Sequence, residues 1–312
     1  MTTERPVEFA VAIPQVFSGP QVDPAALRAF LSRAEALGYH SVWGQEQILG
    51  AAGTLEPVTL LAHAAALTRR VRLGVAVLLT PLRSPLQLAK SLTTVDQLSG
   101  GRLTVGVGLG GRTDVYPAFG LSAERRVRRF TEGLEVLKRL WTQERVTFSG
   151  EFWKLENVAM APKPIQKPHP PIWFGARHPN ALRRAVALGE GFIGAGSTST
   201  ADFRRQVAHV RASLGEAKRN PSTFAIAKRV YLAVDPDRGR ALARLREWFG
   251  WYYGNAALAD QVAIVGPAEE CVTGLREVRA AGAELILLNF VSEELENMER
   301  AAREILPAVV AR

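Results

Sequence analysis

Apolar residues recur in short unbroken runs along the chain, separated by longer stretches in which apolar positions repeat every three or four residues. Runs without polar alternation are typical of parallel strands covered on both faces, and a helix-period stretch between two of them supplies the crossover. The pattern predicts eight strands, at residues 9–13, 41–43, 71–79, 103–107, 172–174, 192–194, 224–234 and 285–290. Strands that alternate with helices over this length predict a (β/α)8 TIM barrel.

Helix-start signals support this interpretation. A short polar residue or a proline ahead of an apolar repeat favours the first turn of a helix. Such signals occur at Asp23-Pro24, Pro57, Ser84-Pro85, Ser122 with Glu124, and Pro267. With 312 residues and 47% hydrophobic content, we expect one domain over residues 1–312.

One segment, at residues 144–171, interrupts the alternation. Its first part reads as a β-hairpin that turns at Ser149-Gly150, and its second part, at residues 161–171, is rich in proline. We interpret the segment as an insertion after the fourth helix and expect it to lie over the barrel.

The charge balance does not by itself assign a partner. Lys and Arg outnumber Asp and Glu by 39 to 30, which gives a formal net charge of +9. The densest basic run, at residues 125–129, contains no aromatic residue of the kind that stacks on bases. We therefore expect a solvated helix face there and no nucleic-acid partner.

Two further absences shape the expectation. No uninterrupted apolar run reaches the roughly 18 residues that cross a bilayer, and the chain does not open on a basic segment followed by an apolar one. We therefore expect a cytoplasmic protein with no membrane partner. The single cysteine, Cys271, has no second thiol to pair with, so we expect a small buried hydrophobic residue.

In a barrel of this kind the active site lies where the strands end. The residues that follow the predicted strands include no GxSxG nucleophile, no HExxH or Cys/His spacing for a metal, and no GxxxxGK[ST] phosphate loop. Gly106, Gly108 and Gly111 match GxGxxG, but the acidic residue that should follow about 20 positions later is missing. We expect these glycines to let a flat ring or a substrate approach the backbone.

The best candidate for an anion site follows the strand at residues 172–174. The strand ends in a short loop, and Pro179 is placed to open a helix whose free N–H groups and positive end would face a phosphate. Arg177 adds a positive charge. An ordinary strand-to-helix turn with a surface arginine is the equally weighted alternative.

Glu46 is the candidate acid, because a carboxylate at a strand end inside a concave site has a path to a raised pKa and to proton transfer. A structural carboxylate bonded to backbone or to an arginine fits the same sequence. Aromatic residues at position 173 and at 248–253 are candidate platforms for a flavin-like ring, although aromatics at helical spacing are usually packing residues.

Several stretches together resemble the luciferase-like monooxygenase superfamily, the flavin and deazaflavin enzymes related to bacterial luciferase. They cover nearly the whole chain, at residues 36–43, 70–111, 170–175, 189–193 and 265–287. The resemblance implies a (β/α)8 barrel, commonly a homodimer, that binds a small-molecule substrate and uses a flavin or its 5-deaza analogue, coenzyme F420.

The third strand, at residues 73–81, looks most like the F420-dependent branch. In that branch a non-prolyl cis peptide, here matching Ala76-Val77, forms a bulge behind the deazaflavin ring. Glu46 matches the acidic residue near the ring. The resemblance and the glycine argument together assign the cofactor to Ala76, Val77, Gly108, Asp114, Gly175, Ala176, Arg177 and His178.

The chain departs from the family pattern at three positions. Gln47 stands where luciferases and F420-dependent sugar-phosphate dehydrogenases usually carry a catalytic histidine, Gly111 where the latter carry a glutamate, and Thr198 where they carry a lysine for the substrate phosphate. These departures argue against the oxidation of glucose 6-phosphate by that machinery.

The sequence therefore predicts an F420-dependent oxidoreductase that transfers a hydride between deazaflavin C5 and a small organic substrate. Glu46 is assigned to proton handling or ring polarisation, and Gln47 and Asp114 to hydrogen bonding with ring or substrate. Two alternatives stay open: a monooxygenase that uses reduced FMN, and a non-catalytic carrier of flavin or F420.

Overall fold

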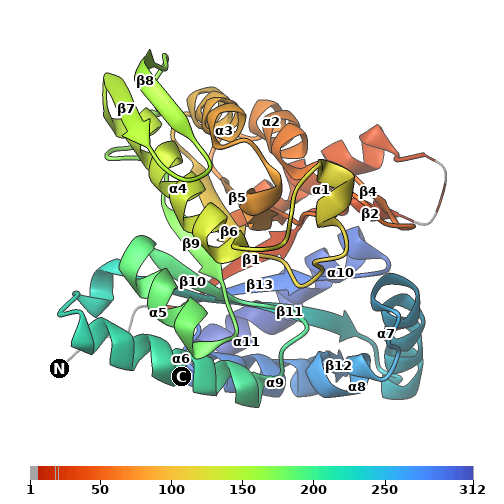
Figure 1. Cartoon of the computed structure of the whole chain (residues 1–312). Helices are drawn as coiled ribbons and strands as arrows, with labels where there is room; N and C mark the ends of the chain where they lie inside the picture. Colours follow the sequence, from red (N-terminus) through yellow and green to blue (C-terminus); the bar gives the residue numbers. More distant parts are fainter. Residues whose placement is uncertain (1–5, 18, 20, 312) are drawn as a thin grey trace.

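Eight parallel strands form a closed barrel in the computed structural model, which describes residues 6–17, 19 and 21–311 (Figure 1). The barrel closes where β10 pairs with β11. In order around the barrel, the strands are β1 (Glu8–Ala12), β3 (Ser41–Gly44), β5 (Arg72–Leu79), β6 (Leu103–Gly108), β9 (Ile172–Gly175), β10 (Gly191–Gly194), β11 (Ala225–Val234) and β13 (Leu285–Asn289). They coincide with the eight predicted strands, so the predicted TIM barrel is confirmed.

Helices cover the outside of this barrel. Asp23 accepts hydrogen bonds from the N–H groups of Ala25 and Ala26 at 2.8 and 3.2 Å and so caps the first helix, as its sequence predicted. The helices are α1 (Pro24–Ala36), α2 (Pro57–Leu67), α3 (Pro85–Ser99), α4 (Arg126–Thr142), α5 (Pro179–Leu188), α6 (Thr200–Glu216), α7 (Arg238–Tyr253), α8 (Leu258–Val262), α9 (Ala268–Ala280), α10 (Glu294–Arg300) and α11 (Leu306–Val310).

The start of α4 differs from its prediction. The hydroxyl of Ser122 accepts a hydrogen bond from the N–H of Glu124 at 3.1 Å, which forms a local turn instead of a helix cap. Arg125 then has a φ of 55°, and the helix begins at Arg126.

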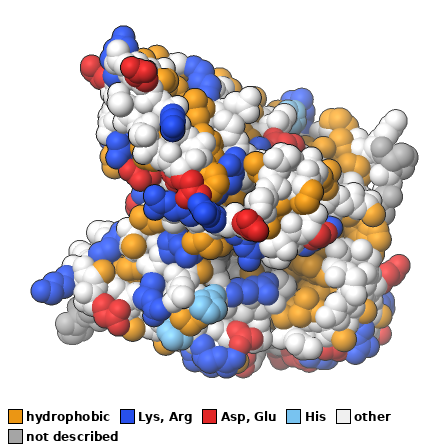
Figure 2. Space-filling view, in the orientation of Figure 1, with side chains coloured by type: hydrophobic (Ala, Val, Ile, Leu, Met, Phe, Trp, Pro, Cys, Tyr) orange, Lys and Arg blue, Asp and Glu red, His pale blue; other side chains and the backbone are white. Residues whose placement is uncertain are grey.

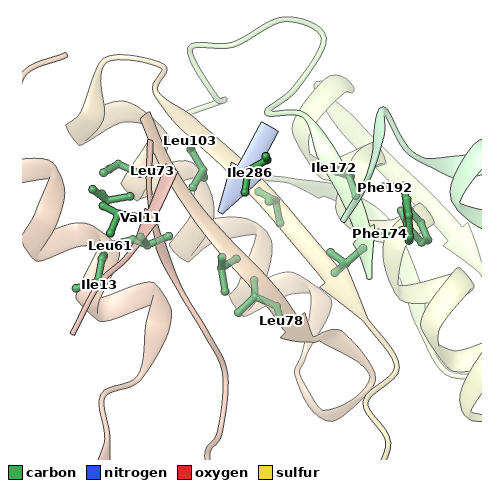
Figure 3. Packing of buried hydrophobic residues seen from close by; sticks show 14 of the residues in the cluster. Val11, Ile13, Leu61, Leu73, Leu78, Leu103, Ile172, Phe174, Phe192 and Ile286 are labelled. Atoms are coloured by element: carbon green, nitrogen blue, oxygen red, sulfur yellow. The ribbon is translucent and has the colours of Figure 1, made fainter. Parts of the chain in front are cut away.

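The main hydrophobic core lies between the strands and the helices. Figure 3 shows part of it, from Val11 and Leu61 on one side to Phe174 and Phe192 on the other. Cys271 belongs to the same cluster and is fully buried, as expected.

A second, smaller core fills the inside of the barrel. The rings of Trp43 and Trp173 lie 5.3 Å apart there, opposite strand positions that carry glycine. A Cβ atom at Gly74 would lie 2.4 Å from the Trp43 ring, and one at Gly191 would lie 2.6 Å from Trp173. Trp173 therefore packs in the barrel interior, which is the packing role that the sequence analysis gave as the alternative to a ring platform.

The inserted segment packs on the outside of α3 and α4. Its hairpin consists of β7 (Arg145–Ser149) and β8 (Lys154–Ala159), beside α4 in Figure 1. The carboxylate of Glu132 accepts the N–H groups of Phe152 and Trp153 at 2.8 and 3.0 Å, which fixes the turn to α4. The predicted hairpin is confirmed, but its predicted place over the barrel is wrong, because these contacts hold it against the outer helices.

Three short strands escaped the sequence analysis. β2 (Val16–Phe17) pairs with β4 (Gly53–Thr54), and β12 (Ile264–Gly266) pairs with the end of β11. Two and three residues are too few to give a period. Within the part of the chain that the structure describes, no helix is both long and apolar enough to cross a membrane.

A bulge interrupts the pairing of β5 with β6. The Ala76–Val77 peptide is cis, as the family resemblance implied, and the register between the strands shifts between Val75 and Leu78. The backbone of β5 approaches β6 so closely that a Cβ atom at Gly106 would lie 1.9 Å from the carbonyl oxygen of Val75. Glycine at position 106 is therefore required by the bulge itself.

We predict that Gly106→Ala lowers the free energy of unfolding by about 3 kcal/mol. The added methyl group would clash with the main-chain carbonyl of Val75, which cannot rotate aside as a side chain can. Urea denaturation followed by circular dichroism measures the change. Gly215→Ala is the matched control, since a Cβ atom at that position of α6 meets nothing within 4 Å. It should leave stability unchanged or raise it by about 0.5–1 kcal/mol. Equal stability of the two variants would contradict the argument.

Candidate active site at the barrel mouth

Two cavities open at the carboxyl ends of the strands. The larger, of about 720 Å³, is lined by Glu46, Gln47 and apolar side chains that include Leu79 and Phe119. The smaller, of about 460 Å³, is lined by residues of β5, β6, β9, α4 and α5. Both are lined by Gly110, Gly111 and Arg177, so they adjoin along one wall.

The smaller cavity collects most of the predicted cofactor residues. Its lining includes Val77, Gly108, Gly175, Ala176, Arg177 and His178. Phe130 of α4 and Arg184 of α5 also line it. Figure 2 shows a hollow between the part formed by α4 with its hairpin and the part formed by α5 and α6, with Lys and Arg side chains beside it.

The glycines around this cavity have a different role from the one expected. A Cβ atom at Gly108 would lie 2.6 Å from Cγ2 of Val77, and one at Gly175 would lie 3.0 Å from Cγ1 of the same side chain. These two glycines are needed first of all to accommodate the side chain of Val77 in the bulge, and not to let a ligand approach. Gly111 is the exception, because a Cβ atom there meets nothing within 4 Å.

The loop after β9 is held by contacts within the chain. Nδ1 of His178 accepts the N–H of Asn180 at 3.2 Å and caps α5, and the His178 carbonyl accepts the N–H of Ala181 at 2.8 Å. The first N–H groups of α5 therefore already have partners, contrary to the expectation of free donors. Nη2 of Arg177 donates to the hydroxyl of Ser197 at 2.5 Å, which places this cation on the wall that both cavities share.

Glu46 has a fully buried carboxylate that is occupied by hydrogen bonds. It accepts the N–H of Leu79 at the end of β5 and the Nε–H of Arg83, the latter at 2.8 Å. Arg83 also donates to Glu56, at 2.7 Å, and Glu56 caps α2. Burial raises the pKa of Glu46, and the guanidinium of Arg83 opposes that rise. These contacts are the ones expected of a structural carboxylate bonded to backbone and to an arginine. A role of Glu46 in proton transfer stays a prediction.

The two remaining predicted residues lie in different surroundings. Gln47 lines the larger cavity, with its amide folded over Gly50. Asp114 lies on the surface, where its carboxylate pairs with Arg112 at 2.6 Å and lines neither cavity. Its partner Arg112 does line the larger cavity, and the predicted hydrogen bond from Asp114 to a ring or substrate stays a prediction. Ala76 faces a third cavity, of about 20 Å³, inside the barrel mouth.

Sequence reasoning missed Arg229, a buried cation on β11 whose hydrogen-bond partners are neutral. Its Nε donates to Oδ1 of Asn289 at 3.0 Å, and its Nη2 donates to the hydroxyl of Tyr231 at 3.2 Å and to Gln45. The Tyr231 hydroxyl lies 2.7 Å from that of Tyr253, which lines the larger cavity. A polar network thus runs from the barrel interior to the cavity wall.

Tyr252 extends the same network. Its hydroxyl accepts a hydrogen bond from Nε2 of Gln45 at 3.1 Å, and its ring stacks on Trp248 with centroids 4.6 Å apart. Burial raises the pKa of Tyr252 to about 12, so its phenol stays protonated. The aromatic residues of α7 are therefore both packing residues and lining of the site.

Lys228 was missed as well. Two adjacent charges inside the apolar run of β11 were the available signal, because a strand covered on both faces has no solvated side for either of them. Lys228 and Arg229 point to opposite faces of the sheet, as neighbours in a strand do. Within residues 6–17, 19 and 21–311, no group of three or more His, Cys, Asp or Glu side chains is placed to hold a metal ion.

Comparisons with known proteins agree with this architecture. The model of the luciferase-like monooxygenase family matches residues 7–285. The solved structure of an F420-dependent secondary alcohol dehydrogenase in complex with an F420-acetone adduct superposes with a TM-score of 0.84, at 20% identity, over 97% of this chain and 99% of that one.

Curated relatives include users of both cofactors. An F420-dependent glucose-6-phosphate dehydrogenase of Beutenbergia cavernae is 31% identical over 264 residues, which cover 81% of this chain and 76% of that protein. An FMNH2-dependent dimethylsulfone monooxygenase of Pseudomonas putida is 26% identical over 353 aligned positions, which cover 98% and 96% of the two chains.

A higher identity extends over a shorter stretch. An uncharacterized protein of Mycobacterium tuberculosis is 45% identical over 123 residues, which cover 39% of this chain and only 43% of that relative. The match over residues 7–285 covers seven of the barrel's eight strands in full and ends at the first residue of β13. The chain therefore belongs to the luciferase-like monooxygenase family.

Proposed function

We propose that the protein is an F420-dependent oxidoreductase that transfers a hydride between deazaflavin C5 and a small organic substrate. The observation that carries the proposal is the pair of adjoining cavities, with the β5 bulge on one wall and Arg177 on the wall that they share. Such a space suits a ligand that has a flat ring and an anionic tail.

The residues at the mouth fit that group. Val77 would support the ring from the bulge, Gly111 leaves open space beside it, and Arg177 with the loop at 175–178 would hold the phosphate. The deazaflavin, when bound, supplies the hydride donor or acceptor carbon. The substrate would then occupy the larger cavity, whose apolar lining includes Leu82, Val115 and Phe119.

The polar groups of the site are suited to placement of reactants more than to strong acid-base chemistry. The Glu46 carboxylate is engaged by Leu79 and Arg83, and Gln47 stands where the family commonly has a histidine. A hydride step depends chiefly on close and oriented placement of donor and acceptor. This favours hydride transfer over the second candidate function, oxygen activation by reduced FMN. The similarity to the Pseudomonas putida monooxygenase supports that second candidate. The homodimer expected from the family resemblance stays a prediction.

We predict tighter binding of F420 than of FMN. The purified protein should be titrated with each cofactor, and tryptophan fluorescence and difference absorbance should be followed. Trp248 reports on the site because its ring stacks on Tyr252, which lines the cavity. Tighter binding of FMN, with oxygen consumption by the reduced form, would assign the protein to the monooxygenases. Tight binding without turnover on a broad substrate panel would indicate a carrier.

Arg177→Ala should weaken cofactor binding by about 10- to 100-fold, the usual effect of losing one or two charge-assisted hydrogen bonds. The same fluorescence titration measures it. Arg183→Ala is the control, because Arg183 is an exposed arginine of the neighbouring helix that bonds only locally to Asn180 among the contacts described. Equal affinities of the two variants would exclude Arg177 from the anion site.

Glu46→Gln separates the two roles of Glu46. If the carboxylate acts in proton handling, turnover should fall at least tenfold while cofactor affinity persists. If it also fixes Leu79 and Arg83, the free energy of unfolding should fall by about 2 kcal/mol, because Arg83 then keeps only Glu56 as a carboxylate partner. We expect both effects, and unchanged turnover would reject the catalytic role.

A further inference from the structure

Lys228 lies on the outward face of β11 and is 2% exposed. Its ammonium group donates to three main-chain carbonyls, those of Ala195 at 2.6 Å and of Thr198 and Arg229 at 2.9 Å. Two of these carbonyls belong to the loop that follows β10. An ammonium group has three N–H bonds, so every donor is used and none is left for a ligand.

The loop that Lys228 holds is part of the candidate site. Ala195 lines the smaller cavity, and Ser197 lines the larger one. The hydroxyl of Ser197 accepts the hydrogen bond from Arg177 at 2.5 Å. A continuous set of contacts therefore leads from the buried ammonium group through residues 195–198 to the guanidinium on the shared wall.

We propose that Lys228 is a positioning residue of the anion site, which aligns Arg177 through the 195–198 loop and takes up a proton when an anion binds there. The proposal rests on the proposed function, because the anion is the phosphate of the cofactor. Lys228 itself touches no ligand.

The charges around Lys228 determine whether anion binding raises or lowers the pKa of its ammonium group. Arg229 follows it on β11, and the charges of Arg177, in the loop after β9, and of Asp202, on α6, also act on it. Burial, then Arg229 and Arg177, lower the pKa of Lys228 to about 7, and Asp202 opposes them. An anion beside Arg177 offsets that positive charge and raises the pKa again. Above pH 7, binding therefore takes up protons, and affinity falls as the pH rises.

Isothermal titration calorimetry of the wild-type protein tests this without any substitution. F420 or FMN, whichever binds, should be titrated at pH 8 in buffers of different ionisation enthalpy. We expect an uptake of between 0.5 and one proton for each cofactor bound, and an affinity that falls about three- to tenfold per pH unit between pH 7.5 and 8.5. An uptake near zero would overturn the proposal.

Variants assign the proton. Lys228→Met should abolish the uptake and weaken binding about tenfold, whereas Lys163→Met should change neither. Lys163 is a matched control because its ammonium group also donates to main-chain carbonyls, those of Leu140 and Gln143. Lys163 itself belongs to the inserted segment and lines neither mouth cavity. Because His178 also lies at the site, His178→Gln should keep the uptake. Uptake that persists in Lys228→Met, or disappears in His178→Gln, would overturn the assignment.

Failure of the proposed function has a different signature. If neither F420 nor FMN binds, the cofactor proposal fails, and inorganic sulfate then serves as the probe because its charge is constant over this pH range. Sulfate should raise the melting temperature of the wild-type protein more at pH 7 than at pH 9, and this difference should vanish in Lys228→Arg. Stabilisation that is absent, or equal at both pH values, would overturn the role of Lys228.

Discussion

The mouth of the barrel depends on the close approach of Val77, on β5, to the ends of β6 and β9. The side chain stands in a bulge of β5 and occupies the space where Gly108 and Gly175 would carry their Cβ atoms. Two neighbouring strands must therefore end in glycine for the third to bend. The carboxylate of Glu46 then bonds the N–H of Leu79, just beyond the bulge, and ties that strand end to Arg83. Shape and electrostatics of the site thus follow from one local distortion.

Buried cations are the second theme of the site. Arg229 points into the barrel and Lys228 points away from it, and both satisfy their donors with neutral oxygens instead of carboxylates. A buried charge without a counterion favours anions nearby and resists further positive charge. The buried cations therefore favour a negatively charged ligand at the mouth even without the contribution of surface arginines.

The barrel could be predicted well from the sequence because the signal for a buried parallel strand occurs eight times along the chain. Every strand is a continuous apolar run, and each error in one run leaves the others intact. The site was predicted less completely. The loop at 175–178 and Glu46 follow strands directly, so chain order alone placed them at the mouth. The long connection after β6 has no period that fixes its course, so chain order could not place Asp114 on a cavity wall, and its role stays a prediction. Two of the three partners of Lys228 lie in the loop after β10, and the sequence does not show that this loop lies beside Lys228.

The inserted hairpin illustrates how this architecture separates its parts. None of the residues that line the two mouth cavities comes from residues 145–159, since the hairpin meets the rest of the molecule through the outer surface of α4 and its flanks. Changes of length or composition in this segment can accumulate without altering the pocket. Evolution is thus free to remodel this outer surface for recognition or solubility while the chemistry of the barrel stays constant.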